Sequence, residues 1–497
     1  MKCSQCIEKP KNETAGHGAS QHYQEPAQDT NVMIETTSKM IVEVEKLKEF
    51  IEEKSAPYDQ QIAQIEAEMN TATRELAEQD EAICYLLNKE VLELGETLTA
   101  GGLMAQFTEA ETLDLDAFKK FLDENPELKP ELEAQFADIK SVQALQPRTR
   151  ERQDNVVIVP VEAMTYEQKL RHNQAIMDAR ALVEKGFVTL DTETTGLGDE
   201  DQIVSVSVIR KNGTYQPYYQ LVHTNVLMPL EVQEVHGITP EMLADAPEFE
   251  EVLPQLQTLI GDKTIVAYNA KFDNRMIEQT ARVRGVQPMT NPWVCSMEMF
   301  KDFSGNNRWI KLGVAAEAMG IRHEGDLHNA KTDALLAYML VEAMAKAEPV
   351  AVYEPRINMP ENATPDSPDY HTHRKAGLEE LLAQLSSVRE QKNAIAKPYN
   401  DRIRDIKKKR DTELAELKAR YDELEKTCKE NVASLGFTVA GENYQIVPSQ
   451  RTTWRIPEII EYAKQNPRSK LGKWVIANIY TKRTVSIKKA PSPKKKK

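Results

Sequence analysis

The chain has 497 residues, of which 40% are hydrophobic and 28% charged, and its formal net charge is −15. This length exceeds the roughly 100–200 residues of one domain, so about two to four units are expected. No apolar run approaches the roughly 18 residues of a membrane helix, and residues 1–13 lack the apolar stretch of a secretory signal. These features favour a cytoplasmic protein without a membrane partner.

The charge differs sharply along the chain. Residues 1–150 carry −15, residues 151–370 carry −14 and residues 371–497 carry +14. Because cations are drawn to phosphates, only the C-terminal part is expected to attract a nucleic acid by its charge. The five cysteines are few and scattered, which argues against a disulfide framework.

Both ends of the chain are predicted to be tails. Residues 1–32 contain almost no large aliphatic side chains and cannot bury enough surface to become ordered. Cys3 and Cys6 form a CxxC pair there, which is either part of a zinc site or two incidental thiols, because a second ligand pair at a familiar spacing is missing. Residues 491–497 form a Lys-rich tail.

Residues 33–150 are predicted to form an acidic helical arm region. Apolar residues recur at helical spacing from Thr37 to Leu94, with many Glu and Lys between them. Pro57 is expected to divide this stretch into two helices or to kink a single one. The acidic segment from Leu115 to Phe136 also looks helical and could pack on the arm.

Residues 165–347 show the alternation of strands and helices expected of an α/β domain. A helix ends near Lys185, and Phe187 to Leu190 makes a buried strand that leads into Asp191-Thr192-Glu193. Further β-like runs follow, two of them joined by a strong hairpin turn at Asn212-Gly213: Ile203 to Ile209, Tyr215 to Val222 and Thr264 to Tyr268.

Asp191 and Glu193 form the first candidate site. Side chains two apart on a strand point to the same side, so these two carboxylates are expected to lie together. Like charges in a poorly solvated site raise each other's pKa, and a divalent cation removes the conflict. Oxygen ligands suit Mg²⁺ or Mn²⁺. A solvated turn is the alternative, since such a triplet arises easily in a long acidic chain.

Further candidate residues stand at helix starts. Asp273 begins a helix that runs to about Arg284, where a capping carboxylate is the alternative. His328 precedes another helix, from Ala334 to Ala345, and Asp333 lies at or near its first turn. Each residue alone has an ordinary structural explanation. Together, four carboxylates and one histidine on the ends of predicted elements indicate a single site.

Residues 348–370 are Pro-rich and are predicted to be a linker. Residues 371–435 repeat the helical pattern as a coiled-coil-like arm, with a break at Pro398. Short matches connect this arm with the first one: Pro57-Tyr58-Asp59 with Pro398-Tyr399-Asn400, and Leu94-Gly95 with Leu435-Gly436, preceded by Cys84 and Cys428. The matches indicate either an internal duplication or the shared composition of charged amphipathic helices.

Residues 436–490 are predicted to form a small basic α+β module. Its expected elements are three β-like runs and one helix: Phe437 to Ala440, Tyr444 to Val447, Thr484 to Ile487, and Pro457 to Lys464. Aromatic and cationic side chains suited to stacking on bases and neutralising phosphates are interleaved there: Trp454, Arg455, Trp474, Tyr480, Lys482 and Arg483. A small core with a solvated basic rim is the alternative.

The middle region resembles the DnaQ-like, or DEDDh, 3′-to-5′ exonuclease superfamily in four runs: LDTETTGL, VHGITPEML, IVAYNAKFD and HNAKTDA. Trp293 to Met297 further resembles the exodeoxyribonuclease X branch and the proofreading subunit of bacterial DNA polymerase III. The resemblance implies an α/β fold with a ribonuclease H-like mixed sheet flanked by helices. It also implies that Asp191, Glu193, Asp273 and Asp333 hold two Mg²⁺ or Mn²⁺ ions, while His328 takes a proton from the attacking water.

The same resemblance implies contacts with the substrate. The backbone at Thr194 and the side chain of Leu197 would meet the terminal base, and His236 and Asn269 would line the nucleotide pocket. A buried structural role is the alternative for His236. Tyr268 stands where many relatives have His, which leaves the metal ligands intact but puts the nearby substrate contacts in doubt.

The expected function is hydrolysis of single-stranded or frayed 3′ ends of DNA to nucleoside 5′-monophosphates, in phage or prophage DNA metabolism. RNA is an alternative substrate, because ribonuclease T and oligoribonuclease share these catalytic positions. The flanks resemble phage Gam-like helical-arm proteins. That resemblance implies DNA-end binding, and self-association or a partner protein through the arms. A third alternative is therefore a DNA-end binder or nuclease inhibitor with an accessory exonuclease.

Overall fold

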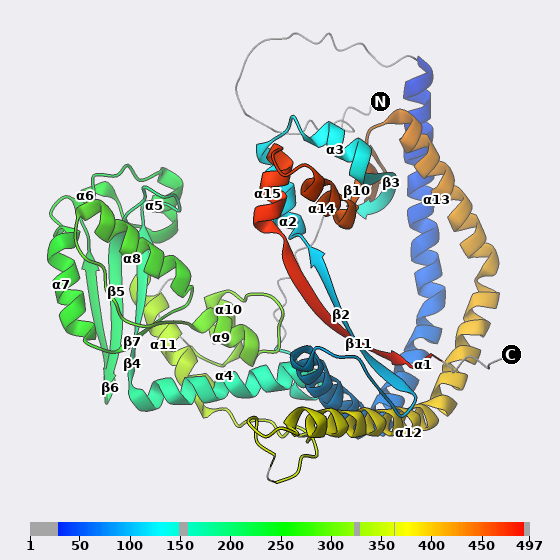
Figure 1. Ribbon diagram of the computed structural model, residues 1–497. Helices are drawn as coiled ribbons and strands as arrows, with labels where there is room; N and C mark the ends of the chain where they lie inside the picture. The colour runs from blue at the N-terminus through cyan, green and yellow to red at the C-terminus, as the bar shows by residue number, and fades with distance from the viewer. Residues whose placement is uncertain (1–27, 149–157, 323–328, 362, 492–497) are drawn as a thin grey trace. The chain divides into compact units, whose positions relative to one another are not determined.

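The protein is described by a computed structural model over residues 28–148, 158–322, 329–361 and 363–491 (Figure 1). Its chain divides into two compact units. The middle unit comprises residues 154–355, and the flanking unit combines residues 1–153 with residues 356–497. None of the helices within the described ranges is both long and apolar enough to cross a membrane.

The middle unit is built on a mixed sheet of five strands in the order β6-β5-β4-β7-β8. The strands are β4 (Phe187–Thr194), β5 (Ile203–Asn212), β6 (Thr214–Leu221), β7 (Thr264–Ala267) and β8 (Trp293–Cys295). The hairpin predicted between β5 and β6 is confirmed, since Asn212 pairs with Thr214 around Gly213, whose φ is +73°. Strand β4 is central, antiparallel to β5 and parallel to β7.

Helices cover both faces of this sheet, as the predicted fold class requires. They are α4 (Tyr166–Lys185), α5 (Leu230–His236), α6 (Pro240–Leu243), α7 (Phe249–Ile260), α8 (Ala270–Arg284), α9 (Ser296–Phe303), α10 (Leu312–Ala318) and α11 (Ala330–Lys346), with a 3-10 turn at Val161–Ala163. One core joins α4, α9 and α11 to Phe187 on β4. A second core joins α7 and α8 to Val188 and Leu190 on the same strand.

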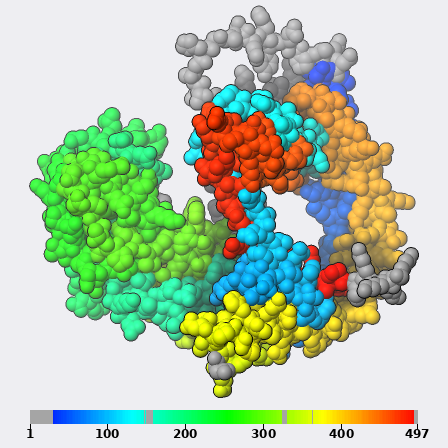
Figure 2. Space-filling view, viewed as in Figure 1, coloured from blue at the N-terminus to red at the C-terminus, as the bar shows by residue number. Residues whose placement is uncertain are grey.

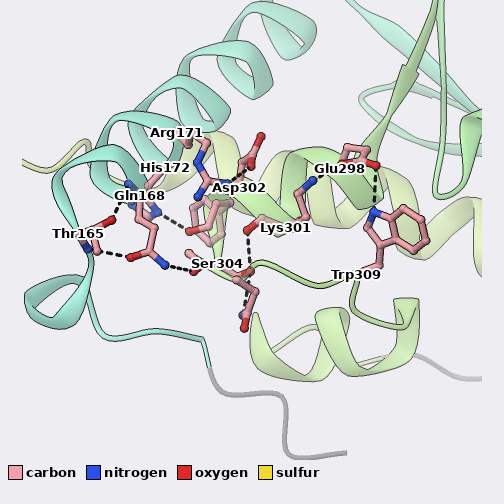
Figure 3. Close-up of polar contacts among 12 residues, drawn as sticks. Thr165, Gln168, Arg171, His172, Glu298, Lys301, Asp302, Ser304 and Trp309 are labelled. Atoms are coloured by element: carbon pink, nitrogen blue, oxygen red, sulfur yellow. Dashed lines mark hydrogen bonds and ion pairs between the residues drawn. The ribbon is translucent and has the colours of Figure 1, made fainter. Parts of the chain in front are cut away.

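The start of α4 is fastened to the segment around α9 by polar contacts (Figure 3). Thr165 and Gln168 form a capping box at the first turn of α4. The Gln168 side chain donates to the carbonyl of Gly305 at 2.6 Å, and Arg171 pairs with Asp302 at 2.8 Å. These contacts hold the chain that follows the edge strand β8 against the body of the sheet.

The flanking unit contains the same order of elements twice, except that the long first helix of one half corresponds to two successive helices of the other. Its first half has α1 (Gln28–Leu94), β1 (Leu98–Ala100), β2 (Leu103–Thr112), α2 (Leu115–Glu124), α3 (Lys129–Phe136) and β3 (Ala137–Pro147). Its second half has α12 (Tyr370–Glu413), α13 (Ala415–Leu435), β9 (Val439–Ala440), β10 (Tyr444–Trp454), α14 (Ile456–Gln465), α15 (Lys470–Asn478) and β11 (Tyr480–Lys489). The repeated order favours the internal duplication over a mere likeness of composition.

A constant separation of 341 residues relates the two halves. It connects Pro57 with Pro398, Leu94-Gly95 with Leu435-Gly436, and Asn125-Pro126 with Asn466-Pro467. The Asn125 and Asn466 side chains make the same hydrogen bond, to the carbonyl four residues earlier. At this separation Cys428 corresponds to Leu87, and both side chains are fully buried. The proposed correspondence of Cys428 with Cys84 is therefore wrong.

Each half completes the sheets of the other. Strand β2 pairs antiparallel with β11 along its whole length, and β3 pairs likewise with β10. The helices of the two halves also share one core. In it Trp454 packs edge-on against Phe118 at 5.2 Å, and Trp474 stacks on Phe121 at 4.6 Å between ring centroids. The suggestion that these two tryptophans stack on bases is wrong, because they pack between the halves.

Several boundaries differ from those predicted, whereas at Pro57 the alternative of a single helix is the one observed. Helix α1 begins at Gln28, within the segment expected to be a tail, and continues through Pro57. Helix α12 likewise continues through Pro398. Packing of Ile62, Ile65 and Ile403 just after both prolines favours unbroken helices. The arms and the C-terminal module, expected as separate domains, belong to one unit because their strands and helices complete one another.

In the ion pairs found between the halves within the described ranges, the carboxylate comes from the first half and the cation from the second. They include Glu43–Arg420, Asp59–Arg410, Glu68–Arg402, Asp80–Arg389, Glu90–Arg374, Glu96–Lys375, Glu109–Arg483, Glu111–Lys464 and Glu127–Lys470. The expectation that the basic C-terminal part is free to seek phosphates needs correction, because much of its charge faces the acidic half.

Candidate active site

Two carboxylates extend from the central strand beyond the end of its neighbour. Strand β7 pairs only with Phe187, Val188 and Thr189 of β4, so β4 runs on past it. Asp191 and Glu193 lie on this extension, and their pairing partners on β5 are serines, which crowd the site little. Because strand side chains alternate, the two carboxylates share one face of the sheet, as predicted.

Asp273 reaches this extension from the first turn of α8. Its Oδ1 accepts a hydrogen bond from the backbone N of Thr192 at 3.0 Å and another from Thr192 Oγ1 at 2.9 Å. The backbone bond satisfies an N–H of β4 that has no β7 partner at this level. Asp273 is only 3% exposed, so it is a buried carboxylate facing β4 and not a solvated helix cap.

Asp333 lies in the first turn of α11. The side chain of Asn329 caps this helix by accepting a hydrogen bond from the backbone N of Lys331. The helix is attached to the central strand, since Thr189 Oγ1 donates to the carbonyl of Ala334 at 2.7 Å. His328, the predicted general base, lies outside the described residues.

The four carboxylates are close enough to repel one another. Burial raises the pKa of Asp191 well above its usual value, and Asp273, Glu193 and Asp333 raise it further. Burial, followed by Asp333 and Asp273, raises the pKa of Glu193 to about 8. Burial also raises the pKa of Asp273 to about 7, although the two hydrogen bonds from Thr192 act in the opposite direction.

This donor set fits a divalent cation by its chemistry. Buried carboxylates that repel each other are stabilised when a cation lies between them, and oxygen-only ligands suit Mg²⁺ or Mn²⁺. Among the described residues, no group of three or more Asp, Glu, His or Cys side chains is already gathered tightly enough to hold a metal. Asp273 instead directs Oδ1 to Thr192, so a bound cation would have to draw the carboxylates together.

A tight loop after β4 presents Leu197 to solvent. Asp201 closes the loop by accepting hydrogen bonds from Thr195 Oγ1 at 2.6 Å and from the backbone N of Gly198 at 2.7 Å. From α8, the Gln279 side chain donates to the carbonyl of Gly198 at 3.0 Å. Leu197 is 76% exposed at the tip of this braced loop, which suits an apolar contact with a ligand.

The other predicted substrate residues have different surroundings. His236 ends α5 half-buried, and its Nδ1 accepts a hydrogen bond from the backbone N of Ile238 at 3.1 Å. Burial lowers the pKa of His236, while the nearby Thr194 backbone has the opposite effect, so this ring lies beside Thr194. Asn269 is the N-cap residue of α8 and does not cap the helix with its side chain. The Tyr268 hydroxyl donates to the carbonyl of Ile310 inside the core, which gives Tyr268 a structural role.

Sequence reasoning missed the residues that support the site. Thr192 was treated as a spacer between two carboxylates, although its backbone and hydroxyl hold Asp273. Asp201 and Gln279 both make hydrogen bonds with Gly198 and so hold the loop. Tyr219 on β6 lies near enough to Glu193 for that carboxylate to raise its pKa, after the larger effect of burial. No local pattern marks these residues, since their partners are distant in sequence.

Similarity to known proteins agrees with this geometry. Residues 188–341 match the RNase T family, described as exonuclease. The uncharacterized exonuclease CP81 of Escherichia phage 186 is 31% identical over 180 residues, which are 34% of this chain and 92% of that protein. The DNA polymerase III subunit epsilon of Aquifex aeolicus is 28% identical over 159 residues, 31% of this chain and 78% of the relative.

Of two further similarities, one covers a small share of the other protein and one has a low TM-score. The PolC-type DNA polymerase III of Bacillus cereus is 27% identical over 174 residues, 34% of this chain but only 12% of the polymerase. The structure of exonuclease X in complex with 5′ overhanging duplex DNA is 24% identical, with a TM-score of 0.27 over 32% of this chain and 90% of that one.

The fold and the clustered carboxylates define a nuclease of the 3′-to-5′ exonuclease class. The chain belongs to the DnaQ-like RNase T exonuclease family. Its middle unit contains the whole matched region, and the flanking unit lies outside the match.

Proposed function

We propose that the chain is a 3′-to-5′ exodeoxyribonuclease that uses two divalent cations, Mg²⁺ or Mn²⁺. Water adds to the terminal phosphorus, the bond from phosphorus to the 3′-oxygen breaks, and that oxygen takes a proton. The products are a nucleoside 5′-monophosphate and a strand with a new 3′-hydroxyl. The main support is the convergence of four carboxylates from β4, α8 and α11. Burial, and then the charge of the neighbouring carboxylates, raises the pKa of Asp191, Glu193 and Asp273.

The carboxylates and His328 would have different roles in the reaction. Asp191, Glu193, Asp273 and Asp333 hold the cations, which when bound neutralise phosphate charge and make water more acidic. His328 receives a proton from the attacking water, for which an ordinary histidine pKa near about 6.5 is well matched. The requirement for His328 is part of the proposal, and its replacement is expected to abolish turnover while leaving cation binding in place.

Contacts with the end of the strand would come from the surface beside the carboxylates. Leu197 packs on the terminal base from its braced loop, the backbone at Thr194 faces the same nucleotide, and His236 and Asn269 line its pocket. A neutral His236 suits this place, because burial lowers its pKa. The relative from Escherichia phage 186 supports a role in phage or prophage DNA metabolism.

The test uses full-length protein with end-labelled single-stranded DNA, duplex DNA and RNA, each with Mg²⁺ or with EDTA. Asp191→Ala is compared with Asp262→Ala, which changes an exposed carboxylate at the opposite end of β7. We expect Mg²⁺-dependent shortening of DNA from the 3′ end that only Asp191→Ala abolishes. Degradation that survives EDTA or Asp191→Ala would overturn the mechanism, and faster hydrolysis of RNA would reassign the substrate.

A further inference from the structure

The loop between α9 and α10 exposes a tryptophan side chain. Trp309 is 67% exposed, whereas the other three tryptophans of the chain are partly buried: Trp293, Trp454 and Trp474. In the space-filling view the α9–α10 region lies on the visible surface of the middle unit (Figure 2). A single exposed apolar side chain is ordinary, so the contacts and the place of Trp309 decide whether it has a role.

Trp309 is held in one orientation by hydrogen bonds of its side chain and of the next residue. Its Nε1 donates to Glu298 Oε1 at 2.9 Å, as Figure 3 shows. Glu298 also accepts a hydrogen bond from Lys301, which together with the bond from Trp309 lowers the pKa of Glu298 and keeps it ionised. Ile310 is 5% exposed, and its carbonyl accepts a hydrogen bond from the Tyr268 hydroxyl. Because the only polar atom of the indole is already bonded, the exposed ring offers a ligand its π-face in a fixed place.

The same contacts place Trp309 beside the carboxylate site. The charge of Lys271 also lowers the pKa of Glu298, so Lys271 lies close to the residue that holds the indole. Lys271 belongs to the first turn of α8, two residues before Asp273. Tyr268 lies between β7 and α8. The turn that leads from β7 into α8 therefore positions Asp273 and, through Tyr268, also holds the chain next to Trp309.

Trp309 and the proposed pocket for the terminal nucleotide lie on opposite sides of the carboxylates. His236 lies beside Thr194, which pairs with β5. Helix α9 begins against the carboxyl end of β7, since the backbone N of Met297 donates to the carbonyl of Tyr268. In the strand order β6-β5-β4-β7-β8, the carboxylates of β4 and α8 stand between these two places. A nucleic acid strand that ends in the pocket and crosses the carboxylates would therefore lead toward Trp309.

Exposed cations accompany Trp309. They are Lys271, Arg308 and Lys311, and within the described ranges none of them forms an ion pair. Residues 151–370 carry a net charge of −14, so these cations are the groups that can attract phosphate at this edge of the sheet. An exposed aromatic ring among cations is typical of surfaces that bind single-stranded nucleic acid.

We propose that Trp309 stacks on an unpaired base of the substrate strand, upstream of the 3′-terminal nucleotide, while Lys271 and Arg308 contact neighbouring phosphates. Every base has a π-face, so this contact tolerates any sequence but requires a base that is not paired. The favoured substrate is therefore a single strand or a 3′ overhang several nucleotides long, rather than a blunt duplex end. The inference rests on the proposed function, since it places a strand end at the carboxylates.

Binding is measured with the full chain carrying Asp191→Ala, so that a fluorescent single-stranded probe of about ten nucleotides is not degraded. Trp309→Ala is compared with Trp309→Phe, which keeps a π-face. The control is Val283→Ala, which truncates an exposed side chain in the last turn of α8, at the other end of the helix from Asp273. A second set of probes has one abasic site at successive positions upstream of the 3′ end.

Trp309→Ala is expected to weaken binding at least about fivefold, the lower end of what one stacked base contributes, and Trp309→Phe to weaken it less. At one position the abasic site should weaken binding to the parent by a similar factor. It should have no further effect on Trp309→Ala, since both changes remove the same contact. Val283→Ala should match the parent.

Three results would each overturn the inference. The first is an independent effect of Trp309→Ala and of the abasic site at every position. The second is an unchanged affinity of Trp309→Ala, as expected if the indole contacts a protein instead. The third is an equal loss in Val283→Ala.

Hydrolysis by the chain with Asp191 intact separates this inference from the proposed function. Trp309→Ala should raise KM for the same oligonucleotide and change kcat little, because the indole binds a base away from the scissile bond. Hydrolysis with an unchanged KM would reject the role of Trp309 alone. No hydrolysis by the unmodified chain, together with coupled losses in the binding series, would reject the proposed function and retain the stacking contact.

Discussion

Asp273 Oδ1 accepts both available hydrogen bonds of Thr192, from its backbone N and its Oγ1, and so ties the first turn of α8 to the central strand. These bonds also lower the pKa of Asp273 against the opposing effect of burial. The position of one candidate metal ligand is thus set by a residue that has no ligand role itself.

Thr192→Val removes the hydroxyl bond and preserves the shape and the backbone bond. Hydrogen bonds to charged groups contribute about 1.5–3 kcal/mol, so kcat/KM is expected to fall at least about tenfold. The Mg²⁺ concentration for half-maximal activity should rise, since Asp273 loses a group that favours its charged form. Thr258→Val, which removes an intrahelical hydrogen bond on the exposed face of α7, is the matched control. Equal Mg²⁺ titrations for both variants would contradict this view of Thr192.

Without divalent cations the middle unit should lose stability as the pH rises from about 5 to about 8. The folded-state pKa of Glu193 is raised to about 8 from an ordinary 4.5. Over this interval the folded state retains a proton that the unfolded state has released, so the free energy of unfolding decreases with pH. Melting curves in EDTA check this, and Mg²⁺ should reduce the decline. A melting temperature that rises with pH in EDTA would show that the carboxylates do not repel as described.

Leu197→Ala should impair substrate binding with little effect on folding. The side chain is 76% exposed, so its truncation removes little buried surface. Loss of an apolar contact of about 1 kcal/mol raises KM roughly fivefold while kcat changes less. Val183→Ala on α4 truncates another exposed aliphatic side chain as the control. Steady-state kinetics on an oligonucleotide distinguish the two, and identical KM values would remove Leu197 from the binding surface.

Arg374→Met should destabilise the flanking unit. Arg374 pairs with Glu90 at 2.6 Å, and the two side chains are only 13% and 15% exposed. Leaving Glu90 largely buried without this partner is expected to cost about 2–3 kcal/mol. Lys375→Met, whose partner Glu96 is exposed, should cost much less. Denaturant unfolding provides the measurement, and the double variant Glu90→Leu/Arg374→Met should regain most of the loss.

The middle unit was largely predictable because its signals are local. Buried runs such as Phe187 to Leu190 and the turn Asn212-Gly213 identify strands without reference to distant residues. Asp191, Glu193, Asp273 and Asp333 stand where strands end or helices begin, and the fold brings them together. The supporting roles of Thr192 and Asp201 could not be predicted from the sequence, since these roles depend on partners from other elements.

The flanking unit was less predictable because its order depends on distant pairing. Strand β2 contains Glu109 and Glu111, which look unsuited to a strand until β11 supplies Arg483 opposite and α14 supplies Lys464. From the sequence, Trp454 and Trp474 looked like exposed aromatic residues in a basic segment, although they pack against phenylalanines of the other half. The matches at Pro57 and Pro398 were visible in the sequence, but the exchange of strands between the halves was not.

The exchange of strands has a consequence for synthesis of the protein on the ribosome. At about 5–20 residues per second, the partners of β2 and β3 emerge on the order of tens of seconds after those strands themselves. During that interval all residues of the sheet in the middle unit have been synthesised. The strands β2 and β3 of the flanking unit still have unpaired edges. A nascent chain would therefore acquire its nuclease fold before its flanking unit, and premature termination would release the former without the latter.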